Sequence, residues 1–335
     1  MAEVVFTEKI EDLYGNDKFL DICIGDILHP DEKPADYLVL SSFPNDYTPT
    51  PKSLIGRLST LGINVADLAS EKERDWRKRW GCWVAGEVNL RKKPLRIVCF
   101  EHGSDTHPKN IVGNVYRTIR EFLMEDQDRR ARCVRVPLLS TGDQGFDRLE
   151  MMSEILRQAY LHLVLVAPIE RIQVFLGQGS DDLHRLLLQA GVVIQAYRTE
   201  RHVTQSGHQF DYFISYRQVD ASRKEVLVEF LQSREPAANI YVDVDQLQPG
   251  SYWKMSLVNA MAASRKVVCL GTDSYFESSE CIDEFHMAMN FSLAKRGFLI
   301  PLLCSRDMTF SKLPVSMARV QWVDVGDPPK FEKAL

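Results

Sequence analysis

The sequence lacks the features of several protein classes. Its 335 residues contain seven widely separated cysteines and no Cys-x-x-Cys pair. This pattern fits free thiols in a reducing cytoplasm and argues against a disulfide framework or a zinc site, so we expect no metal. The first six residues have no charged segment before a long apolar one, unlike a secretory signal. The longest apolar run, 161–169, is interrupted by His162 and is too short to span a membrane.

An excess of positive charge is also missing, because the formal net charge is −5. We therefore expect no nucleic-acid partner, since such proteins carry a basic surface. Residues 76–80, Trp-Arg-Lys-Arg-Trp, form the one local basic and aromatic cluster. Glu71, Glu73 and Asp75 lie directly before it, which favours a solvated helix face of mixed charge over a nucleic-acid contact.

Strand-like apolar runs alternate with segments of helical period along the whole chain, and this alternation predicts an α/β fold. The length favours two domains. Residues 196–209 are polar and without period, so we expect them to link domains at 1–195 and 210–335. The N-terminal strands are predicted at 19–24, 37–40, 83–88, 95–100, 133–139 and 171–176, and the helices at 54–61, 110–124, 149–160 and 180–190. The C-terminal strands are predicted at 210–216, 239–243, 266–270, 297–303 and 319–323, and the helices at 222–233, 252–263 and 279–295.

The C-terminal domain is organised around residues 210–217, Phe-Asp-Tyr-Phe-Ile-Ser-Tyr-Arg. The run is short and almost entirely apolar, which is typical of a strand buried on both faces. Ser215, Tyr216 and Arg217 would lie at its carboxyl end, where open α/β sheets bind their ligands.

Further motifs follow in a fixed order: Ile-Tyr-Val-Asp at 240–243, Ser-Arg-Lys before the strand 267–270, Ser-Ser-Glu-Cys-Ile-Asp-Glu-Phe at 278–285, and Ile-Pro-Leu at 300–302. Together they resemble a Toll/interleukin-1 receptor (TIR) domain over residues 208–335. The resemblance implies a flavodoxin-like fold with a central parallel sheet.

Glu284 is the only charged residue on one face of the predicted helix 279–295, which it shares with Cys281, Ala288 and Phe291. From the period alone, Glu284 is either a functional acid or a surface glutamate. The TIR resemblance aligns it, through the Cys-x-x-Glu motif, with the catalytic glutamate of members that cleave NAD⁺. One carboxylate is sufficient for that reaction, because nicotinamide leaves NAD⁺ as a neutral group and needs no acid to protonate it.

The remaining substrate contacts are expected from the same strand ends. Ser215, Tyr216 and Arg217 could meet ribose and phosphate, and Asp243 precedes a loop at 244–251 that would cover the pocket. Tyr252 and Trp253 could stack on a base, although core packing explains Trp253 equally well. NAD⁺ would be the substrate, and no cofactor is implied. Some TIR domains only self-associate as scaffolds, whereas others become NAD⁺ hydrolases when they assemble.

In the N-terminal domain, Gly-Asp-Ile at 25–27, Ala-Asp-Tyr-Leu-Val at 35–39 and Pro-Leu-Leu-Ser-Thr-Gly-Asp-Gln-Gly-Phe at 137–146 resemble a macro domain over roughly residues 18–190. The resemblance aligns Asp26 with an adenine contact and makes Phe146 a candidate to stack on ribose or base. Its phosphate loop would comprise Ser140, Thr141, Gly142, Asp143, Gln144 and Gly145.

Physical chemistry supports an anion site there, since such a loop exposes backbone N–H groups ahead of a helix N-terminus. A plain glycine turn and a simple turn cap at Asp26 are the alternatives. Residues 41–47 depart from the macro family because they contain no glycine run. This departure favours a pocket that binds a ligand without cleaving it.

The two resemblances together imply a ligand-sensing macro-like domain joined to an NAD⁺-cleaving TIR effector in the cytoplasm. Such pairings resemble bacterial antiphage defence of the Thoeris kind, where a nucleotide signal derived from ADP-ribose switches on NAD⁺ depletion through TIR self-association. The alternative is a non-enzymatic TIR adaptor whose macro-like domain binds ADP-ribosylated partners.

Overall fold

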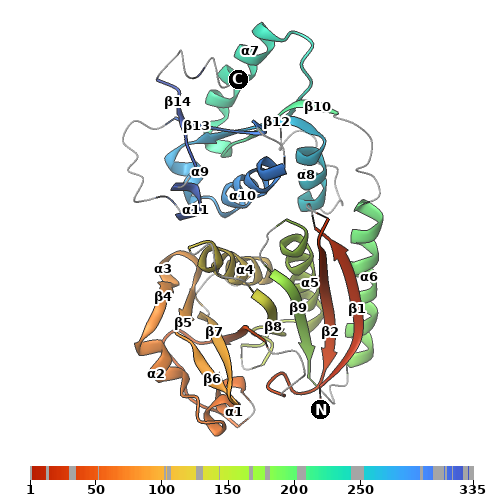
Figure 1. Ribbon diagram of the computed structural model, residues 1–335, viewed down its shortest axis with the longest axis vertical. Helices are drawn as coiled ribbons and strands as arrows, with labels where there is room; N and C mark the ends of the chain where they lie inside the picture. Colours follow the sequence, from red (N-terminus) through yellow and green to blue (C-terminus); the bar gives the residue numbers. More distant parts are fainter. Residues whose placement is uncertain are drawn as a thin grey trace. The chain divides into compact units, whose positions relative to one another are not determined.

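The computed structural model describes residues 2–12, 15–29, 35–51, 53–101, 103, 107–125, 131–142, 144–165, 169–177, 182–201, 209–242, 253–294, 297–304, 313, 315–318, 320–326 and 331. The chain divides into two compact units, Met1–Ala196 and Tyr197–Leu335. Both are mixed α/β structures, as predicted (Figure 1). Within the described residues, no helix combines the length and the apolar character that a membrane crossing would require.

The N-terminal unit is built on one mixed sheet. Its parallel part comprises β2 (Asp17–Ile24), β9 (Ile169–Leu176), β8 (Ala131–Pro137), β3 (Tyr37–Ser42) and β7 (Lys93–Glu101), in that spatial order. Antiparallel strands extend both edges: β1 (Glu3–Glu11) beside β2, and β5 (Cys82–Ala85), β4 (Lys72–Trp76) and β6 (Val88–Leu90) on the β7 side. The parallel strands end at one edge of the sheet, and the predicted ligand loops follow there.

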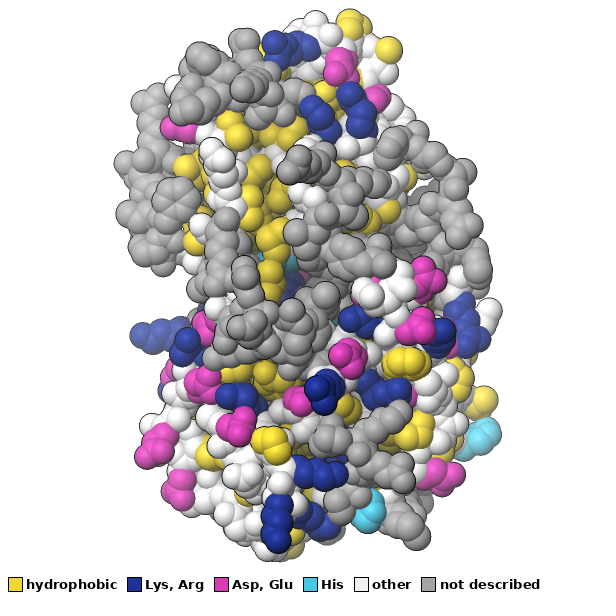
Figure 2. Space-filling view, in the orientation of Figure 1, with side chains coloured by type: hydrophobic (Ala, Val, Ile, Leu, Met, Phe, Trp, Pro, Cys, Tyr) yellow, Lys and Arg dark blue, Asp and Glu magenta, His cyan; other side chains and the backbone are white. Residues whose placement is uncertain are grey.

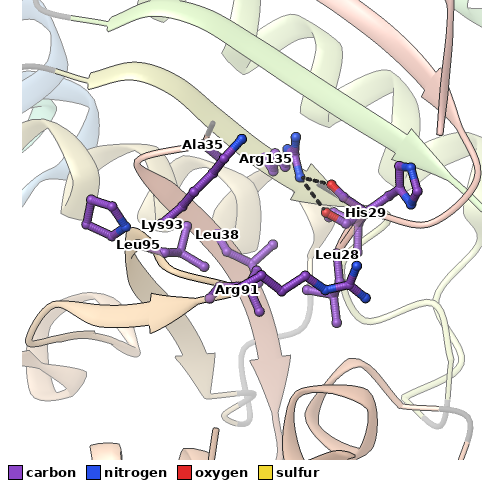
Figure 3. Close-up of a pocket in the computed structure, with 11 residues that line it drawn as sticks. Leu28, His29, Ala35, Leu38, Arg91, Lys93, Leu95 and Arg135 are labelled. Carbon is purple, nitrogen blue, oxygen red and sulfur yellow. Dashed lines mark hydrogen bonds between the residues drawn. The ribbon is translucent and has the colours of Figure 1, made fainter. Parts of the chain in front are cut away.

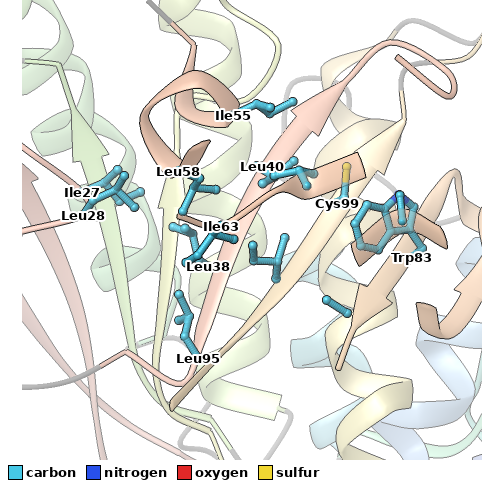
Figure 4. Packing of buried hydrophobic residues seen from close by; sticks show 14 of the residues in the cluster. Ile27, Leu28, Leu38, Leu40, Ile55, Leu58, Ile63, Trp83, Leu95 and Cys99 are labelled. Atoms are coloured by element: carbon cyan, nitrogen blue, oxygen red, sulfur yellow. The ribbon is translucent and has the colours of Figure 1, made fainter. Parts of the chain in front are cut away.

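Helices cover this sheet. On one face, α1 (Leu54–Thr60) and α2 (Val65–Ser70) pack their apolar residues on the strands, and Figure 4 shows Ile55 and Leu58 of α1 beside Leu38 and Leu40 of β3. Side-chain caps start both helices, since Ser53 and Asn64 accept backbone hydrogen bonds from their first turns. The other long helices are α4 (Pro108–Met124), α5 (Arg148–Leu165) and α6 (Leu183–Arg201).

Some N-terminal elements differ from the prediction. The last helix, α6, continues to Arg201, so the first residues of the expected linker are helical. Its apolar period continues beyond residue 190, because Val193 and Ile194 are buried as Leu186 and Ala190 are. The strands β1 and β4 and the helix α2 were not predicted, whereas the short helix α3 (Arg77–Trp80) lies where a helix face was expected.

The C-terminal unit has a parallel sheet in the order β11 (Ile240–Val242), β10 (Phe210–Ser215), β12 (Ser264–Gly271), β13 (Leu299–Leu303) and β14 (Val323–Asp324). Its helices are α7 (Ala221–Arg234), which follows a 3₁₀ turn at Gln218–Asp220, α8 (Trp253–Ala262), α9 (Asp273–Glu277), α10 (Ser279–Ala294) and α11 (Val315–Ala318). The expected last strand, 319–323, is instead the short β14. The chain leaves β10 toward β11 and returns to β12 on the other side, so the strand order reverses at β10.

Candidate functional site

Glu284 lies on α10 beside the carboxyl end of β10, at this reversal of strand order. Its side chain is buried, with 4% of its surface exposed. The Ser215 hydroxyl, at the end of β10, donates a hydrogen bond of 2.5 Å to Glu284 Oε2. Open α/β sheets bind ligands where the strand order reverses, so this carboxylate occupies the position that the fold favours for a ligand.

A tyrosine lies behind the pair. The Tyr275 hydroxyl is 2.9 Å from Ser215 Oγ, and both side chains are fully buried. Tyr275 belongs to α9, which starts where Thr272 caps the Tyr275 N–H at 3.1 Å. Burial raises the pKa of Tyr275 well above its ordinary value and raises that of the neighbouring Cys269 thiol to about 12. Both groups therefore keep their protons at neutral pH.

Two of the other predicted substrate contacts, Tyr216 and Arg217, adjoin this buried core. Arg217 is exposed, and its Nη1 donates to Ser278 Oγ at 3.2 Å, just before α10. The Tyr216 carbonyl accepts a contact of 3.6 Å from Cys281 Sγ. Asp243, Tyr252 and the loop between them lie outside the described residues, and Trp253 is the first residue of α8. Sequence reasoning missed Tyr275, although its place just after the third strand of the unit could have marked it.

A second candidate site is a cavity of about 430 Å³ in the N-terminal unit. It lies at the carboxyl ends of β3 and β8, between the loop after β8 and the segment that leads to α1. Its described lining is Leu40, Ser41, Ser42, Phe43, Asp46, Thr48, Thr50, Ser53, Leu54, Ile55, Pro137, Leu138, Ser140, Thr141, Gly142 and Gln144. Hydroxyl groups dominate its polar surface, and Asp46 is the one charged side chain in that lining.

The loop after β8 has a backbone conformation fixed by hydrogen bonds at Ser140. Ser140 takes a left-handed conformation with φ of 57°, its N–H donates to Ser41 Oγ at 3.2 Å, and its carbonyl accepts from Phe146 N at 3.1 Å. The N–H groups of Thr141, Gly142 and Gln144 have no hydrogen-bond partner in the part of the chain that the structure describes. Such a group of donors favours an anion or a carbonyl.

The helix that follows adds less to this site than we expected. Asp147 caps the N-terminus of α5, because its Oδ1 accepts the Glu150 N–H at 2.8 Å. A carboxylate already compensates the positive end of the helix dipole there. An anion in the cavity would therefore depend on the three loop N–H groups.

Two buried polar atoms also lack partners at the cavity. Ser140 Oγ and Gln144 Oε1 are buried, and neither has a hydrogen-bond partner among the described residues. Gln144 is oriented by its amide nitrogen, which donates to Ser42 O at 2.9 Å. An unpaired buried acceptor is costly, so a ligand hydroxyl or amine that donates to Gln144 Oε1 would be favoured.

The remaining predicted contacts are arranged differently. The Asp26 carboxylate forms an ion pair with Arg57 and accepts the Leu28 N–H at 2.8 Å. Burial alone would raise the pKa of Asp26, but the Leu28 hydrogen bond and the Arg57 guanidinium outweigh it and lower that pKa. Neither Asp26, Gly145 nor Phe146 lines the cavity, and Asp143 lies outside the described residues.

A buried glutamate fixes the wall after β3. Glu101, at the end of β7, is 6% exposed, and it accepts hydrogen bonds from the Tyr47 hydroxyl and from the Asn45 N–H, the latter at 3.1 Å. Arg77 Nη1 pairs with it at 3.4 Å. The segment after β3 is therefore held to the sheet edge by charged hydrogen bonds, which are among the stronger ones.

A smaller hollow of about 30 Å³ lies at the other end of β3, and Figure 3 shows it. Arg135 Nη1 donates to the carbonyl oxygens of Ile27 and His29 at 2.9 and 3.1 Å. This guanidinium fixes the turn that carries Asp26. A volume near that of one water molecule is too small for a nucleotide.

The basic and aromatic cluster at 76–80 is tied into the N-terminal unit. Arg77 pairs with Asp75 at 2.7 Å, and Trp80 is buried. On the face shown in Figure 2, Lys and Arg side chains are interspersed with Asp and Glu. Among the described residues, no group of three or more His, Cys, Asp or Glu side chains could hold a metal ion.

Comparison with known proteins identifies the C-terminal segment. Residues 213–335 match the family model of the TIR domain. No curated protein matches the chain. A TIR domain of a Toll-related receptor from Hydra magnipapillata has 16% identity and a TM-score of 0.30, and the match covers 37% of this chain and 90% of that one. A TIR-STING receptor from C. gigas has 18% identity and a TM-score of 0.33, with 39% and 41% covered.

Other solved structures match the N-terminal part. The Oceanobacillus iheyensis macrodomain, solved with ADP, has 14% identity and a TM-score of 0.42, and the match covers 57% of this chain and 97% of that one. The chain thus carries a C-terminal TIR domain, preceded by an α/β unit that is similar to macrodomains.

Proposed function

We propose that the C-terminal unit cleaves the bond between nicotinamide and ribose in NAD⁺, with Glu284 as the catalytic residue. The observation that carries this proposal is the buried Glu284 carboxylate, held by Ser215 where the strand order reverses. Glutamate side chains are rarely buried unless they are paired, and the Ser215 hydroxyl is a partner of this one. Its negative charge would stabilise the positive charge that develops on the ribose as neutral nicotinamide departs.

The other groups at this edge would bind the remainder of the substrate. The exposed Arg217 guanidinium would pair with the pyrophosphate, and the further candidates are Tyr216, Asp243, Tyr252 and Trp253. Water, or the adenine ring in a cyclising reaction, would then attack the ribose. The products would be nicotinamide and ADP-ribose or a cyclic variant.

The N-terminal cavity would bind the signal that activates this reaction. The free N–H groups of Thr141, Gly142 and Gln144 suit a phosphate, and Gln144 Oε1 suits a ribose hydroxyl. A nucleotide derived from ADP-ribose contains both groups. Its binding would favour assembly of the TIR domains by binding the assembled form more tightly. Such a protein would act in the cytoplasm as a regulated NAD⁺-depleting effector of antiphage defence.

Nicotinamide release from NAD⁺ by the full chain, with and without added ADP-ribose, tests the proposal. Glu284→Gln is nearly isosteric and should lower release by about a hundredfold or more, because the charge is lost while the shape is kept. Glu277→Gln, at the exposed end of α9, is the matched control and should retain the parental rate.

Parental turnover by folded Glu284→Gln protein would contradict the assignment. If neither the parent nor any variant releases nicotinamide at any protein concentration, the adaptor alternative is favoured. A rate that rises faster than linearly with protein concentration would support activation by assembly.

A further inference from the structure

We propose that Tyr275 and Ser215 form a directed hydrogen-bond relay that positions the Glu284 carboxylate for its reaction. Tyr275 OH, Ser215 Oγ and Glu284 Oε2 are connected in that order by distances of 2.9 and 2.5 Å. The three residues come from α9, β10 and α10, so the relay joins the elements that meet at the site. This inference rests on the NAD⁺ cleavage proposed above, in which the Tyr275 hydroxyl has no role so far.

Counting protons fixes the direction of the relay. An ionised carboxylate can only accept hydrogen bonds, so the Ser215 hydroxyl must donate its one hydrogen bond to Glu284. The Ser215 oxygen is then left as the acceptor, and the Tyr275 hydroxyl must donate to it. Each hydroxyl thus has one defined orientation, which a solvated serine would not have.

Burial makes this direction stable. Neither Ser215 nor Tyr275 exposes any side-chain surface, so water cannot replace either partner. The raised pKa of Tyr275 keeps the donor proton on its oxygen. The cap of α9 at Thr272 and the edge-on packing of the Tyr275 ring against Phe276, with 5.6 Å between centroids, hold the phenol in place.

The relay has a chemical consequence for Glu284. A hydrogen bond donated to a carboxylate stabilises its charged form and fixes the plane of its two oxygens. Among the described residues, the titratable groups that interact electrostatically with Glu284 include Cys269 from β12, Tyr275 from α9 and Cys281 from α10, and burial raises the pKa of each. All three keep their protons near pH 7, so none of them adds a charge beside Glu284.

Tyr275→Phe tests the inference, because it removes the donor hydroxyl and keeps the ring; the same hydroxyl also interacts with the Cys269 thiol. In the full chain we expect kcat for nicotinamide release to fall about tenfold, with KM changed by less than about twofold. The acid limb of the pH profile should move up by about one pH unit, because the charged carboxylate is less stabilised once Tyr275 no longer orients the Ser215 hydroxyl. Tyr212→Phe removes a hydroxyl that is only partly buried and donates to Glu235 outside the relay, and it should leave kcat and the acid limb unchanged.

The effects of the single and double substitutions on kcat distinguish a relay from two independent contacts. Ser215→Ala should shift kcat and the acid limb in the same direction, and the double variant should be no worse than the more impaired single one. Additive losses, or an unmoved acid limb in Tyr275→Phe, would overturn the inference even where kcat falls.

A measurement without substrate separates this inference from the proposed reaction. Carbon-13 NMR of labelled glutamate side chains, with the Glu284 signal assigned by its loss in Glu284→Gln, gives the Glu284 pKa in the full chain. If the parent releases no nicotinamide, the proposed function is wrong, but the NMR titration of Glu284 still tests the hydrogen-bond relay. An upward shift in both Tyr275→Phe and Ser215→Ala supports it, and an unchanged Glu284 pKa in either variant refutes it.

Discussion

Gly271, the last residue of β12, should tolerate no side chain. A methyl group there would lie 2.5 Å from Trp322 Cζ3, 2.9 Å from Phe276 Cζ and 3.0 Å from the Leu302 carbonyl oxygen. Carbon atoms in favourable contact are about 3.5–4.0 Å apart, so Gly271→Ala must displace its neighbours.

The neighbours of the added methyl group are themselves tightly packed and cannot move away easily. Trp322 is stacked on Phe285, with 5.1 Å between ring centroids and an interplanar angle of 8°, and Phe276 packs edge-on against it. The Leu302 carbonyl belongs to the neighbouring strand β13, which pairs with β12. Overpacking a core usually lowers the free energy of unfolding by about 1–3 kcal/mol. Because one of the contacts here is with the backbone of a paired strand, we expect Gly271→Ala to lower it by about 2–3 kcal/mol. Phe285 adjoins Glu284, so nicotinamide release should also fall by about tenfold or more.

Urea unfolding of the full chain, followed by pulsed hydrogen exchange at peptides from β12 and α10, measures this loss. Gly191→Ala is the control, because Gly191 is exposed on α6 and a methyl there meets nothing within 4 Å. It should stabilise the N-terminal unit by up to about 1 kcal/mol, the opposite sign. A Gly271→Ala protein within about 0.5 kcal/mol of the parent would refute the packing argument.

The remaining predictions concern the N-terminal unit. Gly142→Glu should fold normally, since a Cβ at Gly142 meets nothing within 4 Å, but its charge should abolish calorimetric binding of ADP-ribose; parental affinity would place the site elsewhere. Arg57→Ala should cost at most about 1 kcal/mol at pH 7, because the pair with Asp26 is 40% and 34% exposed. Asp26 has a lowered pKa, so its contribution is complete above its ordinary value of 3.8 and is lost as pH falls through the folded value. An equal urea-unfolding cost at pH 7 and below pH 3 would contradict this.

The sequence predicted the C-terminal site in part. The buried run at 210–217 and the apolar face around Glu284 have clear periods, which correctly predicted β10 and α10. The hydrogen bond between Ser215 and Glu284 joins residues 69 positions apart. No period specifies such a contact, because side-chain rotamers and the crossing of α10 over β10 depend on packing. The contact between Tyr275 and Ser215 could not be predicted for the same reason.

In the N-terminal unit, the sequence predicted the buried strands better than the exposed ones. In β1, Glu8 and Ile10 are the fully buried residues, so a regular apolar alternation is missing. The pairing of Asp26 with Arg57 depends on a contact between residues 31 positions apart. The cap at Asp147 is local, and the position of an aspartate directly before the start of α5 is the signal that predicts it.

The two candidate sites occupy corresponding places, at the carboxyl ends of parallel strands, yet their chemistry differs. The C-terminal site holds a buried carboxylate, whereas Asp46 is the one acid in the described lining of the N-terminal cavity. Hydrogen bonds from the Thr48 side chain and backbone lower the pKa of Asp46 below its ordinary value of 3.8. A general acid or base works best with a pKa near the working pH, so Asp46 suits neither role. This difference is the physical reason to expect binding without cleavage in the N-terminal cavity, and cleavage at Glu284.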